Sequence, residues 1–446
     1  ATVAWLPWII LISTNLVFEV NSEWFAPLHS EATGIRIILS RLKRAISSSI
    51  SSILILALLL GMMLLAGHAQ TSWYVILFLI IWCGFLVFSR VERPRDHKGE
   101  ANGQKSNLSV RKCMNKFLGV SLVLLLSLII AIALTSIQII PTTEYLLESQ
   151  RAAEVDYETG LTYSFWPWRF LTLVAPDMFG SPAEGDYWGY ANYWEDAIYV
   201  GLLPLVLAIV AIWNGVKGQE PDSMSLKSER SRFPRPTLIR FLSGTIVISF
   251  FLALGKNTPL FPWLYQNVPT FDMFNAPTRF SLWAIFAIAL LAGIGIEYWH
   301  RPANRALYWT RLGTAGAFAV MLGTGIAWIL MGDISPSFIR ATALAGAGLV
   351  IIGGLTLTAP ENQGGSTNFD ESRNVRKYQP WPLLVCLFVT VDLIVAGWGL
   401  NPGIGLDFYR LEAPTTSNLR KMVGDGRLFI PFEDEYSIKF QRFFQF

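Results

Sequence analysis

Apolar runs long enough to cross a lipid bilayer recur along this chain, and they limit its fold more than any other feature. A helical span needs roughly 17–25 mostly apolar residues. Ten candidate runs lie at 2–18, 49–66, 71–90, 117–140, 197–213, 237–255, 279–297, 309–330, 338–359 and 381–400. Only 15% of the 446 residues are charged, whereas a soluble domain averages about 25%. The sequence therefore predicts an all-α polytopic membrane protein with about ten transmembrane helices.

The charges of the connecting segments alternate along the chain. Arg and Lys gather in the loops at 19–48, 91–116, 214–236, 298–308 and 360–380. The intervening segments at 67–70, 141–196, 256–278, 331–337 and after 400 are acidic or poor in cations. Because short basic loops stay in the cytoplasm, this alternation predicts that the second set of segments lies outside the cytoplasm.

The same pattern predicts two domains. Residues 1–400 form a transmembrane helical domain with the long outer loop 141–196, and residues 401–446 begin an extracytoplasmic C-terminal domain. In this tail a turn signal at Gly424, Asp425 and Gly426 adjoins strand-like stretches, which predicts a short β-containing segment with a hairpin. The chain starts inside an apolar run and stops inside a strand-like one, so we expect both ends to be cut from a longer protein.

The outer loop 141–196 is dense in carboxylates and aromatic rings. Pro141 is expected to end the fourth span, and the residues that follow it, up to Arg151, have the spacing of an amphipathic helix on the membrane surface. Trp166 and Trp168 favour anchoring at the lipid–water interface. The same rings could instead form the floor of a sugar site.

Three acids of this loop are candidates for a functional role. Asp177 follows Pro176 in a predicted turn, and Glu195 and Asp196 directly precede the fifth span. Carboxylates at membrane depth cost free energy unless they are paired or hydrated, which makes them functional candidates. The structural alternative for Glu195 and Asp196 is a solvated helix N-terminus, where acids are electrostatically favoured.

Two further candidates, Arg279 and His68, come from other segments of the outer side. Arg279 enters the seventh span after a Pro-containing turn, and its planar guanidinium suits a phosphate or a carboxylate. Asp272 is close in sequence, so a structural Asp272–Arg279 salt bridge fits the pattern equally well. His68 stands at the outer end of the second span and could face the same cavity, although a lone interfacial His is more often structural.

Other functions lack their sequence signals. The chain has no P-loop, GxGxxG turn, zinc spacing, serine-hydrolase elbow or pair of haem or retinal ligands. Cys83, Cys113 and Cys386 indicate neither a disulfide nor a metal site, and the net charge of +3 does not indicate nucleic acid as a partner. No cofactor is evident, and dependence on a divalent metal stays open. Glycines in the later spans favour close helix packing, with a dimerisation face as the alternative.

Several short segments carry a resemblance to a known family. They are AGHAQTSWY, IIPTTEYLLESQR, LVAPDMFG, NYWEDAIYVGLLPLVLA and FDMFNAPTRF. Together they resemble the bacterial YfhO-like membrane proteins, which belong to the GT-C class of polyprenyl-phosphate-sugar-dependent glycosyltransferases. The segment NPGIGLDFYR followed by GRLF is similar to that family's junction into its outer C-terminal domain. The resemblance extends over nearly the whole chain.

The resemblance implies transfer of a sugar from a polyprenyl-phosphate carrier to an envelope acceptor, at the outer face of the bacterial plasma membrane. The implied site residues are Arg279, Arg151 and His68 around the phosphate, and Glu195, Asp177 and Asp272 as the catalytic candidates that line the cavity, in a reaction where a carboxylate acts as general base. GT-C enzymes usually keep their catalytic acid in the first outer loop, and we expect that loop to lie upstream of this chain. Membrane lipids and other membrane proteins are the further partners expected.

Two other functions stay compatible with the sequence. A GT-C-like fold could serve as a non-catalytic structural subunit of a larger membrane assembly. A transporter or flippase of lipid-linked sugars would also need many spans, but transporters tend to show internal repeats, and none is found in this chain.

Overall fold

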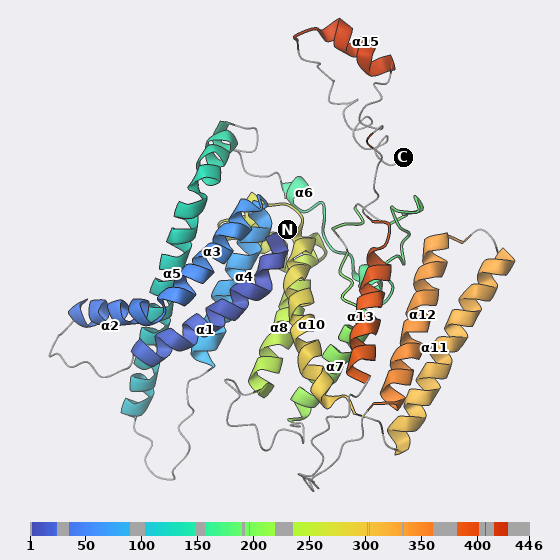
Figure 1. Cartoon of the computed structure of the whole chain (residues 1–446), viewed down its shortest axis with the longest axis horizontal. Coiled ribbons are helices and arrows are strands. Elements are labelled where there is room, and N and C mark those ends of the chain that lie inside the picture. The colour runs from blue at the N-terminus through green and yellow to red at the C-terminus, as the bar shows by residue number, and fades with distance from the viewer. Residues whose placement is uncertain are drawn as a thin grey trace. The chain divides into compact units, whose positions relative to one another are not determined.

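The computed structural model describes residues 2–24, 35–89, 103–148, 157–189, 192–195, 197–218, 235–300, 302, 304–331, 334–359, 381–400, 406 and 414–426. Over these residues the chain is helical, without a strand (Figure 1). It divides into two compact units, the first formed by Ala1–Thr162 with Lys227–Trp283 and the second by Tyr163–Leu226 with Ala284–Phe446. The boundary falls inside α10 (Ser281–Gly295).

The first unit is a bundle in which α1, α3, α4 and α5 pack against one another. Its elements are η1 (Thr2–Trp5), α1 (Leu6–Trp24), α2 (Ile35–Ser48), α3 (Ile50–Leu65), α4 (Ala69–Phe88), α5 (Gly103–Glu148), α6 (Tyr157–Gly160), α8 (Arg235–Ala253), η6 (Gly255–Asn257), α9 (Leu260–Asn267), η7 (Phe271–Met273) and η8 (Pro277–Phe280). On α3 the buried side chains Ile53, Leu56 and Leu60 follow at intervals of three and four residues, so one stripe of the helix faces the bundle.

The second unit packs α7 against α12 and α13, and α11 against α12. Its elements are η3 (Pro167–Leu173), α7 (Leu202–Lys217), η9 (Ile296–Tyr298), α11 (Asn304–Met331), α12 (Pro336–Leu357), α13 (Trp381–Gly397) and α15 (Pro414–Val423). Leu202, Leu203 and Leu207 of α7 form a buried cluster with Ile352 and Val385 from the neighbouring helices. Apolar contact between helices therefore forms the core of this unit.

Close helix packing accounts for some of the glycines in the later spans. A Cβ atom on Gly353 of α12 would lie 1.9 Å from Thr314 Oγ1 of α11, and one on Gly295 would lie 2.0 Å from the Leu207 carbonyl oxygen. Neither position has room for a side chain. By contrast, a Cβ atom on Gly316 or Gly323 of α11 would meet no atom within 4 Å.

Each of the ten apolar runs predicted to span the membrane contains a helix. Within the described residues, seven helices are long and apolar enough to cross a bilayer, and the bent pair α2–α3 would make an eighth. α7 and α13 are shorter apolar helices. Large apolar side chains on the outside of the helices, such as Ile329 at 80% exposed, fit a lipid environment. The chain is an all-α, multi-pass membrane protein over the residues described.

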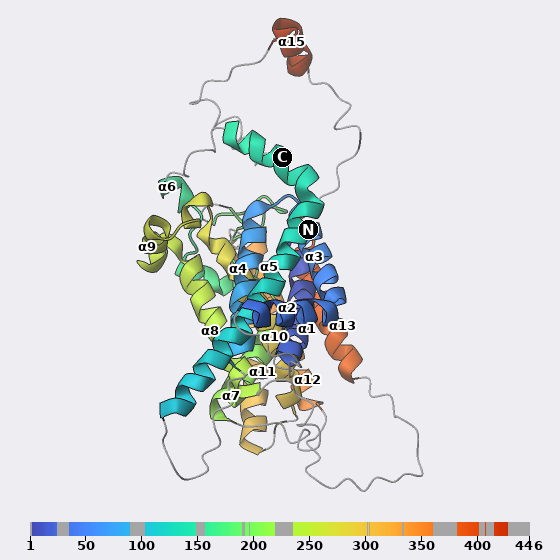
Figure 2. The same ribbon diagram turned by 90° about the vertical axis from the view of Figure 1, so that its left-hand side faces the viewer.

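Two predicted boundaries differ from the structure, and the predicted strands of the tail lie outside it. Pro141 does not end the fourth helix, because α5 continues through it to Glu148, and Figure 2 shows the C-terminal part of α5 bent away from the rest. Proline removes one amide donor and crowds the preceding turn, which kinks a helix without always ending it. The helix α5 also begins at Gly103, inside the predicted basic loop. In the tail, Pro414–Val423 form α15, and the predicted strands after Gly426 lie outside the described residues.

Candidate functional site

Three polar side chains of the first unit meet at the N-terminal end of α4. Arg279 donates a hydrogen bond from Nη1 to Gln70 Oε1, and the same nitrogen lies 3.5 Å from His68 Nε2. His68 and Arg279 are 211 residues apart in the chain. The structure thus brings together two of the residues that were predicted from the sequence to surround a phosphate.

The start of α4 orients the His68 ring. Its Nδ1 accepts a hydrogen bond from the Thr71 amide at 3.1 Å and lies 2.8 Å from Thr71 Oγ1, so His68 caps the helix. A neutral ring whose Nδ1 accepts from this amide carries its proton on Nε2, whereas the other tautomer donates from Nδ1 to Thr71 Oγ1 and accepts from Arg279 at Nε2. In the first of these tautomers, His68 Nε2 and Arg279 Nη1 are two donors on neighbouring side chains. In that tautomer an anionic oxygen beside the two nitrogens would accept from both.

Gln70 couples α4 to the turn that carries Arg279. It is 6% exposed, and its Nε2 donates to Tyr74 Oη at 2.9 Å and to the carbonyl oxygen of Asn275. Its Oε1 accepts from Arg279, so one buried amide positions both the turn and the guanidinium. Nothing local in the sequence singles out Gln70, since Asn275 and Arg279 are 205 and 209 residues away.

Aromatic rings pack beside this cluster. The Trp73 ring lies 5.2 Å from Phe271 and 5.9 Å from Phe280, measured between ring centroids. Asp272 lies between them in sequence, in η7, and is partly exposed. The ion pairs among the described residues do not include Asp272 with Arg279. The salt bridge that the sequence left open is therefore not formed.

An apolar cavity of about 340 Å³ lies in the same unit, between α3, α4 and α5. Its lining includes Leu79 and Ile80 of α4 and Leu124 and Leu128 of α5. Its walls are almost entirely hydrocarbon, so it suits a lipid chain and not a polar substrate.

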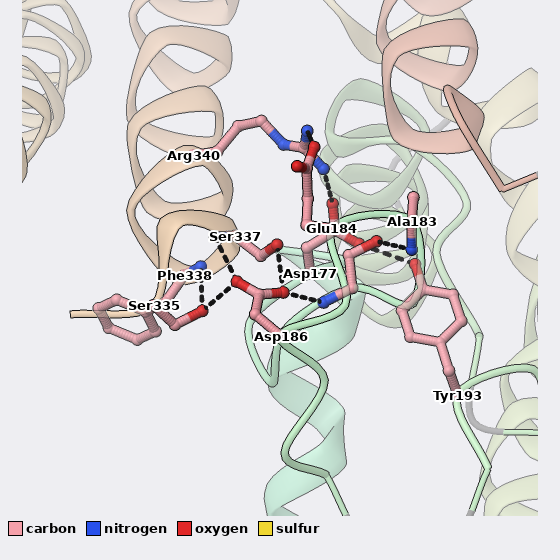
Figure 3. Close-up of polar contacts among 10 residues, drawn as sticks. Asp177, Ala183, Glu184, Asp186, Tyr193, Ser335, Ser337, Phe338 and Arg340 are labelled. Atoms are coloured by element: carbon pink, nitrogen blue, oxygen red, sulfur yellow. Dashed lines mark hydrogen bonds and ion pairs between the residues drawn. The ribbon is translucent and has the colours of Figure 1, made fainter. Parts of the chain in front are cut away.

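In the second unit Asp177 is engaged by two other side chains (Figure 3). Arg340 Nη2 lies 3.0 Å from Asp177 Oδ2, and Arg340 Nη1 lies 2.8 Å from Glu184 Oε1. Tyr193 donates its hydroxyl to Asp177 Oδ1 at 2.8 Å. Burial and the negative charge of Asp177 raise the pKa of Tyr193. Since both oxygens of Asp177 accept from donors, this carboxylate is part of a structural network.

Asp186 ties the same loop to the start of α12 (Figure 3). It accepts from the hydroxyls of Ser335 and Ser337, at 2.6 and 2.7 Å, and from the Ser337 amide at 3.0 Å. The Ser181 amide adds a fourth bond at 2.9 Å. Burial disfavours the charged form, but these hydrogen bonds outweigh it and lower the pKa of Asp186 to about 2. The amide of Ser337 belongs to a first helical turn, where it has no partner within the helix.

Asp392 is a further acid that the sequence did not single out. It lies in α13, where its Oδ1 accepts from the Tyr199 hydroxyl at 2.6 Å and its Oδ2 from the Leu202 amide at 2.9 Å. Leu202 is the first residue of α7. A carboxylate on one apolar helix therefore caps the start of another.

The remaining predicted site residues are distributed as follows. Glu195 lies in a turn of the second unit and is partly exposed, whereas Arg151 and Asp196 lie outside the described residues. Among the described residues, no three His, Cys, Asp or Glu side chains gather where they could hold a metal ion. No protein-family model, curated protein or solved structure matches this chain.

Proposed function

We propose that this chain is a membrane glycosyltransferase of the YfhO-like, GT-C type, with about ten spans. It would transfer a sugar from a polyprenyl-phosphate carrier to an envelope acceptor at the outer face of the bacterial plasma membrane. The observation that carries the proposal is the approach of His68 Nε2 and Arg279 Nη1 to 3.5 Å at the N-terminus of α4.

The chemistry of this cluster suits the phosphate of a lipid carrier. Arg279 supplies a permanent positive charge and a planar set of donors, and His68 adds an N–H donor. The N-terminal end of α4 contributes a partial positive charge. The apolar cavity between α3, α4 and α5 belongs to the same unit and could take part of the polyprenyl chain.

In the proposed reaction an acceptor hydroxyl attacks the anomeric carbon of the sugar. The bond from that carbon to the phosphate oxygen breaks, and the phosphate leaves with the electron pair, while a carboxylate takes the hydroxyl proton. Arg279 and His68 stabilise the charge that develops on the phosphate. Asp272 is the general-base candidate, because it belongs to the same unit and no ion pair within the described residues engages it.

Binding of a polyprenyl phosphate tests the role of Arg279 directly. We expect Arg279→Ala to weaken binding of undecaprenyl phosphate to the purified full chain by about 10- to 100-fold. This loss of affinity corresponds to the free energy that one hydrogen bond to a charged group contributes. Arg279→Lys should bind with intermediate affinity, because it keeps the charge and loses the planar fork of donors.

Two controls make this measurement specific. Arg240→Ala removes an exposed arginine from α8 of the same unit and should leave binding unchanged. The uncharged alcohol undecaprenol should bind wild type and Arg279→Ala alike. Equal affinity of wild type and Arg279→Ala for the phosphate would remove the cluster from the site.

A non-catalytic structural subunit is the second candidate function. The observation that favours it is the engagement of Asp177 by Arg340 and Tyr193, since a catalytic base needs an oxygen available to the acceptor. Asp272→Asn separates the two functions: in the enzyme it should reduce sugar transfer by about 10²–10⁴-fold without loss of phosphate binding. A chain that binds no polyprenyl phosphate would support the structural role.

A further inference from the structure

The helix α2 combines strong amphipathicity with a cluster of cations. Its polar face carries Arg36, Arg41, Lys43 and Arg44. Its apolar side, as defined by helical spacing, carries Ile38, Leu39, Leu42, Ala45 and Ile46. The helix thus has its four cations on one face, together with Ile37, and most of its apolar residues on the other, which is typical of a helix at a membrane surface.

The direction of α2 agrees with that position. The axes of α2 and α3 differ by 75° across the break at Ser49, and Figure 1 shows α2 lying crosswise to α3. If α3 crosses the membrane, α2 runs nearly along its surface. The alternative, a broken span with α2 in the hydrocarbon, would place four cations there, at roughly 2.5–3.5 kcal/mol each on insertion scales.

The protein covers only part of the apolar side of α2. Ala45 is fully buried, and α2 packs against α1 and α5. Leu39 and Ile38, in contrast, are 58% and 37% exposed. Exposed apolar side chains at a membrane surface can enter the boundary between headgroups and acyl chains.

Two cations flank this exposed apolar area. Arg36 and Lys43 are both exposed, and a separation of seven residues places them on the same edge of the helix, about 10 Å apart along its axis. Leu39 lies between them in sequence and next to that edge by helical spacing. This edge thus presents two positive charges and one apolar side chain together.

We propose that the Arg36–Leu39–Lys43 edge of α2 is a binding site for anionic phospholipids. The phosphate groups of the lipid contact Arg36 and Lys43, and Leu39 enters the upper part of the acyl region. Each cation near an anionic surface adds about 1 kcal/mol of binding free energy. The edge therefore selects lipids with net negative charge over zwitterionic lipids.

A local quenching experiment tests this site in the full chain. Cys83, Cys113 and Cys386 are replaced by Ala, Leu39→Cys is labelled with bimane, and the protein is reconstituted with brominated phosphatidylglycerol or brominated phosphatidylcholine. We expect stronger quenching by the brominated phosphatidylglycerol. Substitution of both Arg36→Gln and Lys43→Gln should reduce this preference by up to about thirty-fold at low salt.

The matched control removes two charges elsewhere. Arg420→Gln with Lys421→Gln, in α15, changes the net charge equally and should keep the lipid preference. The proposal fails if both lipids quench alike, or if the Arg36 and Lys43 substitutions have no more effect than the control. It also fails if neither lipid quenches the label, which would show that a protein surface covers α2.

Discussion

The Asp186 carboxylate accepts four hydrogen bonds, so its negative charge stabilises the folded second unit. Its pKa is lowered from 3.8 to about 2, so the native state binds this proton less readily than the unfolded chain. The resulting stability is complete above about pH 5 and is lost as the pH falls through about 2. We expect Asp186→Asn to cost about 1–2 kcal/mol near neutral pH, after allowance for partial exposure, and to remove most of this pH dependence.

Thermal unfolding of the full chain in detergent, between about pH 6 and pH 2, measures this effect. Glu184→Gln is the matched control, because Glu184 is an exposed acid of the same loop whose partner is Arg340. Exposed ion pairs contribute about 0–1 kcal/mol, so the control should unfold nearly as wild type does. Parallel pH profiles for wild type and Asp186→Asn would show that the carboxylate charge does not support the fold.

The acids of this loop show how far single residues can be understood from sequence. Asp177 could be selected because it follows Pro176 in a predicted outer loop, but Arg340, which engages it, lies 163 residues further on. Asp186 has no local signal, since its serine partners on α12 are 149 and 151 residues away. Such distant partners decide whether a loop acid can act as a general base or instead belongs to a structural hydrogen-bond network. The proximity of His68 and Arg279 could be expected, because each adjoins an apolar run at the same predicted side.

Among the helices, the contact of Asp392 with the start of α7 is the one most open to test. Asp392→Ala would leave the Leu202 amide and the Tyr199 hydroxyl without their acceptor. We expect a loss of about 1–3 kcal/mol for buried donors left unsatisfied, seen as a lower unfolding temperature in detergent. Thr390→Val is the control, because the Thr390 hydroxyl bonds to the Cys386 carbonyl within α13 itself. Equal unfolding temperatures for both variants would mean that water replaces the carboxylate.

Helices of this chain follow from sequence better than their ends do. A long apolar run predicts a helix because every backbone N–H and C=O group inside a bilayer needs a hydrogen-bond partner. A helix supplies these partners within the same segment. Helix ends depend on more specific interactions. α5 passes through Pro141 because a bend accommodates the proline ring. α7 begins at Leu202, whose amide donates a hydrogen bond to the Asp392 carboxylate of α13. Gly295 and Gly353, which have no room for a Cβ atom, likewise depend on the helices beside them.

Across the whole molecule, segments of the predicted non-basic set contact one another within each unit. In the first unit, Gln70 contacts Asn275 and the Ala276 amide donates to the Gly160 carbonyl at 3.2 Å, so three non-basic segments meet. In the second unit, the loop around Asp186 contacts the start of α12. At the other end of α12, the indole N–H groups of Trp299 and Trp381 donate to Thr356 and Leu355, next to the basic loops. Loop charge alone indicated the same grouping.

This grouping predicts which side of the membrane two exposed positions occupy. In a chain with its three cysteines replaced by Ala, we expect Ala183→Cys in the Asp186 loop to react with a membrane-impermeant maleimide in intact expressing bacteria. Lys217→Cys, at the C-terminal end of α7, should react only after the membrane is permeabilised, since short basic loops stay in the cytoplasm. The reverse labelling would place the loop 141–196 in the cytoplasm, and sugar transfer at the outer face would then be excluded. Lys217→Cys thus serves as the opposite-side control for Ala183→Cys, since both side chains are exposed.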